Sequence, residues 1–223
     1  MIIAPSHGFV LLSLPKVAST SLDAALERYH ETPPARRQPP KHQNVRAFHQ
    51  TTVRKVERLG FGRDAYELVC LFREPVAWLE SWWRYRQRDH TRENRSERFT
   101  GDIAFDDFAE LFLTDKERTG ISGRPAQFVA GDPEQGWRID RIFALDRPDV
   151  WTAWFSEQVG APVEVTRRNQ ASARRPPELD ADLRARLEAW FEPEREILDH
   201  LAVTGSWQPP HGWTPSGLAT DDD

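Results

Sequence analysis

The sequence is poor in the residues that build disulfides and metal sites. Cys70 is the only cysteine among 223 residues, so no disulfide can form within the chain and a zinc knuckle is excluded. The seven histidines show no HExxH-like pairing, and we therefore expect no metal. Cys70 itself lies in the apolar stretch of residues 68–72, which is typical of a buried thiol with a structural role.

Long apolar runs and a surplus of positive charge are absent as well. The longest apolar run, residues 8–14, is far shorter than the roughly 20 residues of a membrane-spanning helix, and no charged segment precedes it as in a signal peptide. We therefore expect a cytoplasmic protein with no membrane span. The net charge of −5 argues against a nucleic-acid partner, because such binders normally carry a basic surplus. A local cluster of cations can still bind an anion, and the oligomeric state is left open.

The composition is that of one globular domain. A hydrophobic fraction of 39% with 29% charged residues suits a chain that folds around a single core, and no internal repeat is present. Residues 206–223 are rich in Pro, Gly and Asp, which is typical of a loose chain end. We therefore predict a single α/β domain over residues 1–205, followed by a loose C-terminal tail over residues 206–223.

Apolar runs alternate with helical patterns along this domain. Continuous apolar runs predict buried strands at residues 9–13, 66–72 and 139–145, with shorter candidates at 45–49 and 163–166. Helical spacing predicts helices from residue 19, at 51–59, from Pro75, at 105–113 and 150–159, and in two segments between 179 and 201. Such alternation predicts a three-layer α/β fold with a doubly wound, mostly parallel sheet. In these sheets, ligands bind beyond the carboxyl ends of the strands.

The turn after the first predicted strand has the composition of an anion site. It places Lys16 and three hydroxyl residues, Ser19, Thr20 and Ser21, at the start of a helix. Unpaired backbone N–H groups and the positive end of the helix dipole favour a phosphate or sulfate there, and Lys16 adds a full charge. No glycine lies between residues 14 and 19, so the GxxxxGK[ST] spacing of nucleotide triphosphatases is missing and ATP is disfavoured.

A second sharp turn follows the strand predicted at residues 66–72. Arg73 leaves the strand tip, Pro75 opens the next helix, and Ser81 lies about two turns along it. A guanidinium group can hold a phosphate through two parallel hydrogen bonds. This turn lies at the same edge of the sheet as the turn that carries Lys16.

Together the two segments resemble the phosphate-binding motifs of the sulfotransferase family that uses 3'-phosphoadenosine-5'-phosphosulfate. The first motif of that family has the form PKxGTTxL, and this chain follows it at Pro15, Lys16, Ser19, Thr20 and Leu22. Ala18 stands where glycine is usual in the family. The second motif is matched by the offsets between Arg73, Pro75 and Ser81. A looser similarity covers residues 169–201, so the resemblance spans roughly residues 9–201.

The resemblance implies a fold, a reaction and a set of site residues. The implied fold is the P-loop nucleotide-hydrolase-like sulfotransferase fold. The implied reaction moves a sulfuryl group by in-line displacement to an acceptor hydroxyl, with a carbohydrate favoured, or to an amine. It leaves adenosine 3',5'-bisphosphate and requires no metal. The implied donor-binding residues are Pro15, Lys16, Val17, Ala18, Ser19, Thr20, Ser21, Arg73 and Ser81, and Lys16 is also the implied catalytic cation.

The acceptor side of the site is less defined by the sequence. His49 is the first candidate for the base that accepts the acceptor's proton, and a helix-flanking histidine without a catalytic role is the alternative. His42 and Glu80 are weaker candidates for the base. Trp82 and Trp83 are adjacent and must point in different directions, so at least one of them faces the interior or a cleft.

Other interpretations of the same residues stay open. Lys16 can be a solvated loop lysine, and Arg73 can pair with Glu74 or Glu80 in a surface salt bridge. The arginine-rich residues 84–98 favour a solvated helix end or loop that could contact an acidic acceptor. The alternative function is a non-catalytic or kinase-like nucleotide-binding protein of the P-loop superfamily.

Overall fold

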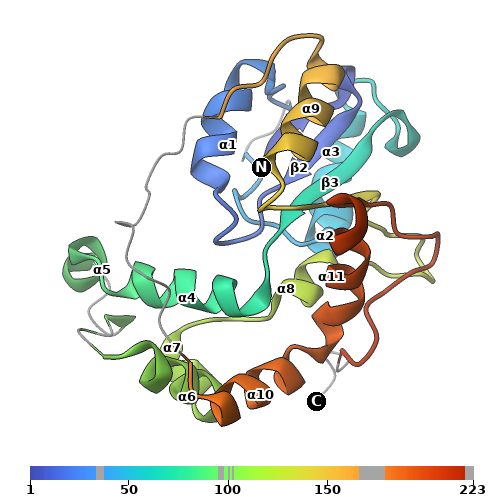
Figure 1. The fold of residues 1–223 in the computed structure, drawn as a ribbon. Coiled ribbons are helices and arrows are strands. Elements are labelled where there is room, and N and C mark those ends of the chain that lie inside the picture. The colour runs from blue at the N-terminus through green and yellow to red at the C-terminus, as the bar shows by residue number, and fades with distance from the viewer. Residues whose placement is uncertain (34–37, 95–97, 100, 102, 166–178, 219–223) are drawn as a thin grey trace.

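The centre of the protein is a five-stranded sheet (Figure 1). The computed structural model describes residues 1–33, 38–94, 98–99, 101, 103–165 and 179–218. The strands lie in the order β1 (Ile2–Ala4), β2 (Phe9–Leu12), β3 (Glu67–Phe72), β4 (Arg141–Ala144) and β5 (Ser206–Trp207). The three central strands are parallel, and β1 and β5 pair antiparallel at the two edges. The α/β class and the mostly parallel sheet are confirmed.

The central strands are buried on both faces. Every residue of β2 is buried, and so is every residue of β3 and β4 except the first of each. Because successive side chains of a strand point to opposite faces, unbroken burial means that both faces are covered. The ring of Phe9, for example, packs edge-on against Phe155 at 5.2 Å between ring centroids.

Helices follow each of the parallel strands. Helix α1 (Ser19–Leu26) follows β2, α4 (Pro75–Arg86) follows β3, and α9 (Pro148–Val159) follows β4. The remaining α-helices are α2 (Val45–Ala47), α3 (Val53–Glu57), α5 (Asp89–Asn94), α6 (Phe105–Thr114), α7 (Lys116–Thr119), α8 (Pro125–Val129), α10 (Ala181–Trp190) and α11 (Glu192–Thr204). The strand–turn–helix unit is thus used three times, and its turns lie at the carboxyl ends of the parallel strands.

A second apolar cluster forms where α4, α6 and α10 pack together, away from the sheet (Figure 1). Phe112 of α6 lies at its centre, with ring centroids 4.7 Å from Trp190 and 5.9 Å from Phe191. Trp78 of α4 belongs to the same cluster. This cluster anchors α4, which leads away from the strand end at Phe72.

The strand predicted at residues 45–49 is wrong. Val45–Ala47 form α2 and Phe48–Thr52 continue as a π-helical turn. The side chain of Asn44 caps this helix, because its Oδ1 accepts a hydrogen bond from the N–H of Ala47 at 2.7 Å. Val45 and Phe48 are both fully buried at a spacing of three, which places them on one side of a helix.

Two further differences concern the later part of the chain. Residues 163–165 are not in a strand, and residue 166 of that predicted strand lies outside the described residues. Ser206–Trp207, which the sequence places in the tail, pair with β4 as strand β5. Gly205 makes this possible, because its left-handed backbone (φ 75°) ends α11 and its carbonyl accepts from the N–H of Ala144 at 2.9 Å. Residues 219–223 of the predicted tail also lie outside the described residues.

Within the described ranges, every helix falls short of the length and apolar character that crossing a bilayer requires.

Candidate functional site

The first turn, residues 13–18 between β2 and α1, has an unusual backbone. Lys16 and Ala18 adopt left-handed conformations, with φ of 69° and 56°, and they are the only non-glycine residues of the described chain with positive φ. Such a conformation costs a residue with a Cβ roughly 1–2 kcal/mol. Among the described side chains none caps the start of α1, and the N–H of Ser21 already donates to the carbonyl of Ala18 at 3.0 Å, so the helix start offers an anion the N–H groups that precede Ser21.

The second turn, residues 73–74 between β3 and α4, is organised differently. The carboxylate of Glu74 caps α4 by accepting hydrogen bonds from the N–H groups of Val76 at 2.9 Å and Ala77 at 2.6 Å. Arg73 instead reaches across to the first turn, where its Nη1 donates to the carbonyl of Lys16 at 3.3 Å. Glu74 is therefore committed to the helix, and among the described residues Arg73 forms no ion pair.

The two turns enclose one cavity of about 530 Å³, which we call the cation-lined cavity. Its walls are formed by Pro15, Lys16, Ala18, Thr20, Ser21, Lys41, His42, Arg73, Ser81, Trp82, Tyr85, Arg88 and Leu145. Seven of the nine predicted donor-binding residues are in this lining. Val17 is the exception among the described side chains, because it is buried in the core beneath the turn. The side chain of Ser19 lies outside what the structure describes.

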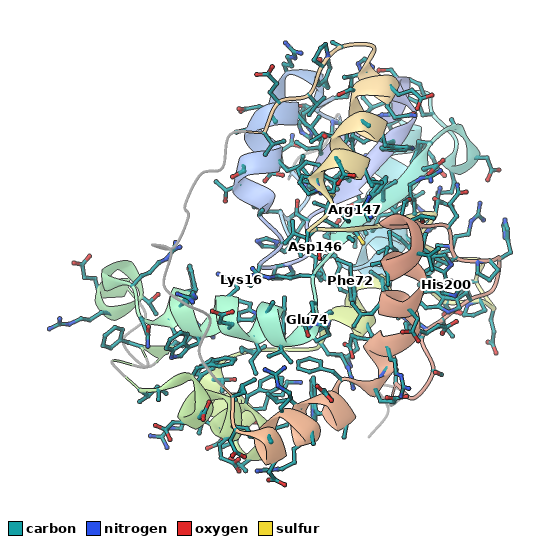
Figure 2. All side chains as sticks on the ribbon, in the orientation of Figure 1. Lys16, Phe72, Glu74, Asp146, Arg147 and His200 are labelled. Carbon is teal, nitrogen blue, oxygen red and sulfur yellow. The ribbon has the colours of Figure 1, made fainter. Side chains whose placement is uncertain are left out.

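Positive charge accumulates in this cavity, and none of the described residues that line it carries a carboxylate. The ammonium of Lys16 lies 3.9 Å from the ring centroid of Tyr85 and 5.1 Å from that of Trp82. Burial, and then the charges of Arg88 and Arg73, lower the pKa of Lys16 to about 7. In Figure 2 Lys16 lies between the loop after β2 and helix α4. A bound anion would relieve this repulsion, so the cavity is suited to phosphate or sulfate groups.

The structure does not bring His49 to this cavity. The Nε2 atom of His49 lies 3.4 Å from the carbonyl of Arg138, and its ring stacks on Trp137 at 5.8 Å. Burial, and then the charge of Arg63, lower its pKa to about 4. His49 is absent from the lining of the cation-lined cavity and from the linings of the two other large cavities that the described residues form.

His42 is the histidine that does line the cavity. Its Nδ1 lies 2.7 Å from the carbonyl oxygen of Ser13, at the start of the first turn. Glu80, the remaining candidate for the base, is paired with Arg84 at 2.5 Å and is not part of the lining. The weaker histidine candidate of the sequence is therefore the one placed beside Lys16.

Sequence reasoning missed Arg88 and Tyr85 as parts of the site. Ser81, Tyr85 and Arg88 are spaced by four and three residues, which brings them to one side of α4 and its continuation. That spacing was a signal that could have found them. At least one of the two adjacent tryptophans was predicted to face the interior or a cleft: Trp82 lines the cavity, and the ring centroid of Trp83 lies 5.5 Å from that of Phe105.

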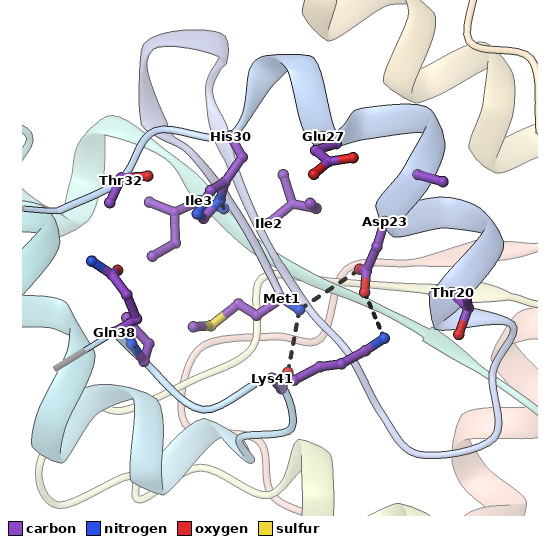
Figure 3. Close-up of a pocket in the computed structure, with 12 residues that line it drawn as sticks. Met1, Ile2, Ile3, Thr20, Asp23, Glu27, His30, Thr32, Gln38 and Lys41 are labelled. Atoms are coloured by element: carbon purple, nitrogen blue, oxygen red, sulfur yellow. Dashed lines mark hydrogen bonds and ion pairs between the residues drawn. The ribbon is translucent and has the colours of Figure 1, made fainter.

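A carboxylate cavity of about 550 Å³ lies along α1 next to the cation-lined cavity, and Thr20 lines both (Figure 3). Asp23 and Glu27 line it, and Asp23 pairs with Lys41 at 2.9 Å. Lys41 lines both this cavity and the cation-lined cavity, so Asp23 neutralises one cation at their shared border. No group of three or more His, Cys, Asp or Glu side chains among the described residues is arranged to hold a metal.

No protein-family model, curated protein or solved structure matches this chain. The assignment of a function therefore depends on the chemistry of the two turns.

Proposed function

We propose that the chain is a sulfotransferase that uses 3'-phosphoadenosine-5'-phosphosulfate as its donor and transfers the sulfuryl group to an acceptor hydroxyl or amine. One observation carries this proposal. Lys16 and Thr20 from the first turn and helix α1 share one cavity with Arg73 and Ser81, which follow β3, and the described lining of this cavity contains no carboxylate. The two cations are 57 residues apart in the sequence. A nucleotide with phosphates on both its 3' and 5' positions needs two such anion sites.

The arrangement of the sheet supports the same proposal. Strands β2, β3 and β4 are parallel neighbours, and both anion-binding turns follow the carboxyl ends of adjacent strands. That is the edge at which open parallel α/β sheets bind their ligands, although the strands here follow chain order and lack the reversal of a doubly wound sheet. A P-loop-like sulfotransferase fold accounts for the strand–turn–helix unit that carries Lys16, although the turn itself contains no glycine.

Each lining group has a distinct part in the proposed transfer. The N–H groups at the start of α1 and the hydroxyls of Thr20 and Ser21 hold the 5'-phosphate. Lys16 stabilises the bridging oxygen, which gains charge as its bond to sulfur breaks and the acceptor oxygen bonds to that sulfur. Arg73 and Ser81 hold the 3'-phosphate, the guanidinium through paired charge-assisted hydrogen bonds.

His42 is the base that this geometry supports best. A carbonyl oxygen can only accept a hydrogen bond, so the contact with Ser13 requires the proton to be on Nδ1. The Nε2 atom then carries the lone pair that can take the proton of the acceptor hydroxyl. A histidine held in this tautomer beside Lys16 is consistent with a carbohydrate acceptor, the class that the resemblance favours.

Nucleotide affinity tests the donor. Isothermal titration calorimetry should show adenosine 3',5'-bisphosphate binding at least tenfold more tightly than ATP, because Arg73 and Ser81 recognise the 3'-phosphate that ATP lacks. Arg73→Ala should weaken bisphosphate binding by about 10- to 100-fold. Arg195→Ala, a change at an exposed arginine paired with Glu192, is the matched control and should leave it unchanged. Tighter binding of ATP, or unchanged affinity in Arg73→Ala, contradicts the proposal.

Turnover separates an enzyme from a binding protein. With labelled donor and a panel of glycans, lipids and phenols, we expect transfer that Lys16→Ala abolishes. Bisphosphate binding without transfer to any acceptor would instead favour a non-catalytic nucleotide-binding protein. Magnesium-dependent consumption of ATP would favour the kinase-like alternative.

A further inference from the structure

A third cavity lies directly beside the cation-lined cavity. It has a volume of about 660 Å³, and we call it the adjoining cavity. Pro15 and His42 line both cavities, so His42 stands at their common border. A group bound in the adjoining cavity therefore lies next to His42, which also lines the cavity that contains Lys16.

The charged side chains of this lining are all basic. Arg46, Lys116 and Arg124 contribute to it, and the described residues supply no aspartate or glutamate. This is unexpected in a protein with a net charge of −5, where a random patch of surface holds more acids than bases. The lining therefore selects for negative charge.

One of the three cations is already neutralised. Arg124 pairs with the fully buried Glu194 through its Nε at 3.0 Å and its Nη2 at 2.5 Å. The same carboxylate accepts a hydrogen bond from the N–H of Ala126 at 2.9 Å. Arg124 and Glu194 thus join helices α8 and α11, and this pair has a structural role.

The other two cations keep their charge for a ligand. Among the described residues, neither Lys116 nor Arg46 forms an ion pair with a carboxylate. The ammonium of Lys116 lies 5.1 Å from a ring centroid of Trp190, and the Nε of Arg46 donates to the carbonyl of Gly131 at 3.2 Å. Burial, and then the charge of Arg124, lower the pKa of Lys116. A half-buried ammonium beside another cation is stabilised when an anion binds.

The rest of the lining mixes polar and apolar groups. Asn44, Gln127 and Thr214 supply hydrogen-bonding side chains, and Phe128 and Leu218 supply apolar surface. Saccharides have both kinds of surface, so a charged saccharide is better matched to this lining than a purely apolar molecule.

We infer that the adjoining cavity binds the acceptor, and that this acceptor carries a carboxylate or sulfate group which Arg46 and Lys116 recognise. The inference rests on the proposed function, because it assigns the substrate class of the same site. Lys116 and Arg46 are then specificity-determining residues, whereas His42 and Lys16 act at the reacting atoms.

Binding of paired probes without nucleotide tests the charge preference. The first pair is a tetrasaccharide of alternating glucuronate and N-acetylglucosamine with its carboxyl-reduced form. The second pair is a sulfated galactose tetrasaccharide with its desulfated form. At least one charged probe should bind about tenfold or more tightly than its neutral partner. The pair that shows the preference identifies carboxylate or sulfate as the recognised group, and equal binding within both pairs overturns the inference.

Variants test whether Lys116 and Arg46 cause the preference for charged probes. Lys116→Ala and Arg46→Ala should each reduce binding of the preferred charged probe by about tenfold and leave the neutral probe unchanged, while Lys116→Arg should retain the preference. Arg118→Ala, on the exposed side of the same short helix α7, is the control. If Lys116→Ala weakens the charged and neutral probes equally, its role is structural and the inference fails.

Bisphosphate affinity, measured on the same proteins, separates this inference from the proposed function. Both alanine variants should bind the bisphosphate like the wild type, because neither residue lines the cation-lined cavity. A wild-type protein that binds bisphosphate but does not distinguish the probes overturns only the acceptor inference. A wild-type protein that does not bind bisphosphate overturns the proposed function, and with it the acceptor role of the adjoining cavity.

Discussion

The two turns that form the cation-lined cavity are built in opposite ways. The second turn is relaxed: Glu74 satisfies the first N–H groups of α4, and Pro75 has the backbone angle that a helix start requires. The first turn is strained: Lys16 and Ala18 are left-handed, and α1 begins without a side-chain cap. The first turn therefore leaves backbone donors for a ligand, whereas the second offers only the side chain of Arg73.

The first turn lowers the stability of the fold, and it is also the turn that offers backbone donors to a ligand. A missing cap costs about 1 kcal/mol, and each left-handed residue with a Cβ costs roughly the same. Strain of this kind concentrates at functional sites, where the surrounding structure holds it in place. In this protein it is held by Arg73 and Trp78, which hydrogen-bond the carbonyls of Lys16 at 3.3 Å and Pro15 at 3.0 Å. The relaxed turn thus supports the strained one.

The largest effect should come from removing the charge of the first turn. Lys16→Met should lower the rate of sulfuryl transfer by about 10²- to 10³-fold, because the leaving oxygen loses its cation. Bisphosphate affinity should fall less, by about tenfold, since Arg73 still holds the 3'-phosphate. Single-turnover rates and calorimetry measure the two quantities. Lys41→Met is the matched control, because Lys41 lines the same cavity but is neutralised by Asp23. Equal losses in both variants would show that Lys16 has no special role.

The histidine bound to the first turn should matter next. His42→Gln should lower the transfer rate by about 10²-fold or more while leaving bisphosphate affinity unchanged, because a base acts on the acceptor and not on the donor. His49→Gln should leave the transfer rate unchanged, since His49 is held at Arg138 and Trp137 outside the cavity. If His49→Gln lowers the transfer rate and His42→Gln does not, the base is His49 and not His42.

The positions of the two turns could be predicted from the sequence, because they depend on where the strands end. Buried parallel strands have recognisable apolar runs, and the carboxyl ends of neighbouring strands must meet at one edge of the sheet. For this reason the apolar pattern placed the turns at Lys16 and Arg73 at one edge of the sheet, and the resemblance to the sulfotransferase motifs added Ser81. Arg73 pairs with neither Glu74 nor Glu80, because the first caps a helix and the second pairs with Arg84.

The choice between the two histidines could not be predicted in the same way. His42 and His49 are seven residues apart, and only the path of the chain between β1 and α3 decides which of them meets the first turn. Valine and phenylalanine are residue types that are common in strands, but here they are spaced by three and follow the cap at Asn44, so the segment is helical and His49 lies at Arg138. Arg88 was missed because it lies in a run of charged residues, where only its spacing of seven from Ser81 marks it as part of the cavity.

The pH dependence of binding should distinguish the two turns. In the free protein the pKa of Lys16 is lowered to about 7, whereas the guanidinium of Arg73 stays charged. Above pH 7 the phosphates are fully ionised, but Lys16 must take up a proton to pair with them, so bisphosphate affinity should fall by up to about tenfold per pH unit. Calorimetry at pH 8 in two buffers of different ionisation enthalpy should show this proton uptake. Lys16→Met should show no proton uptake on binding. If proton uptake persists in this variant, another group takes up the proton.

The same shift in the pKa of Lys16 has a consequence for the stability of the unliganded protein. Between about pH 7 and the ordinary lysine pKa of 10.5, the unfolded chain keeps a proton on this amine that the folded protein has released. The free energy of unfolding should therefore rise with pH across this window. Below pH 7 both states bind the proton, and Lys16→Met should be more stable than the wild type there. Urea unfolding at pH 6 and pH 9 measures both effects.

The smallest effect should come from relaxing the strained backbone itself. Ala18→Gly should raise the free energy of unfolding by about 0.5–1 kcal/mol, because glycine adopts φ near 56° without the Cβ clash and this gain exceeds its extra loss of chain entropy. Ala24→Gly, at an exposed position inside α1, should lower it by a similar amount, since there glycine has only the entropic cost. If urea unfolding shows that the two variants change the free energy of unfolding in opposite directions, the strain lies at residue 18. If both variants destabilise the protein, the left-handed turn carries no strain, and the contrast with the relaxed second turn reduces to the missing cap.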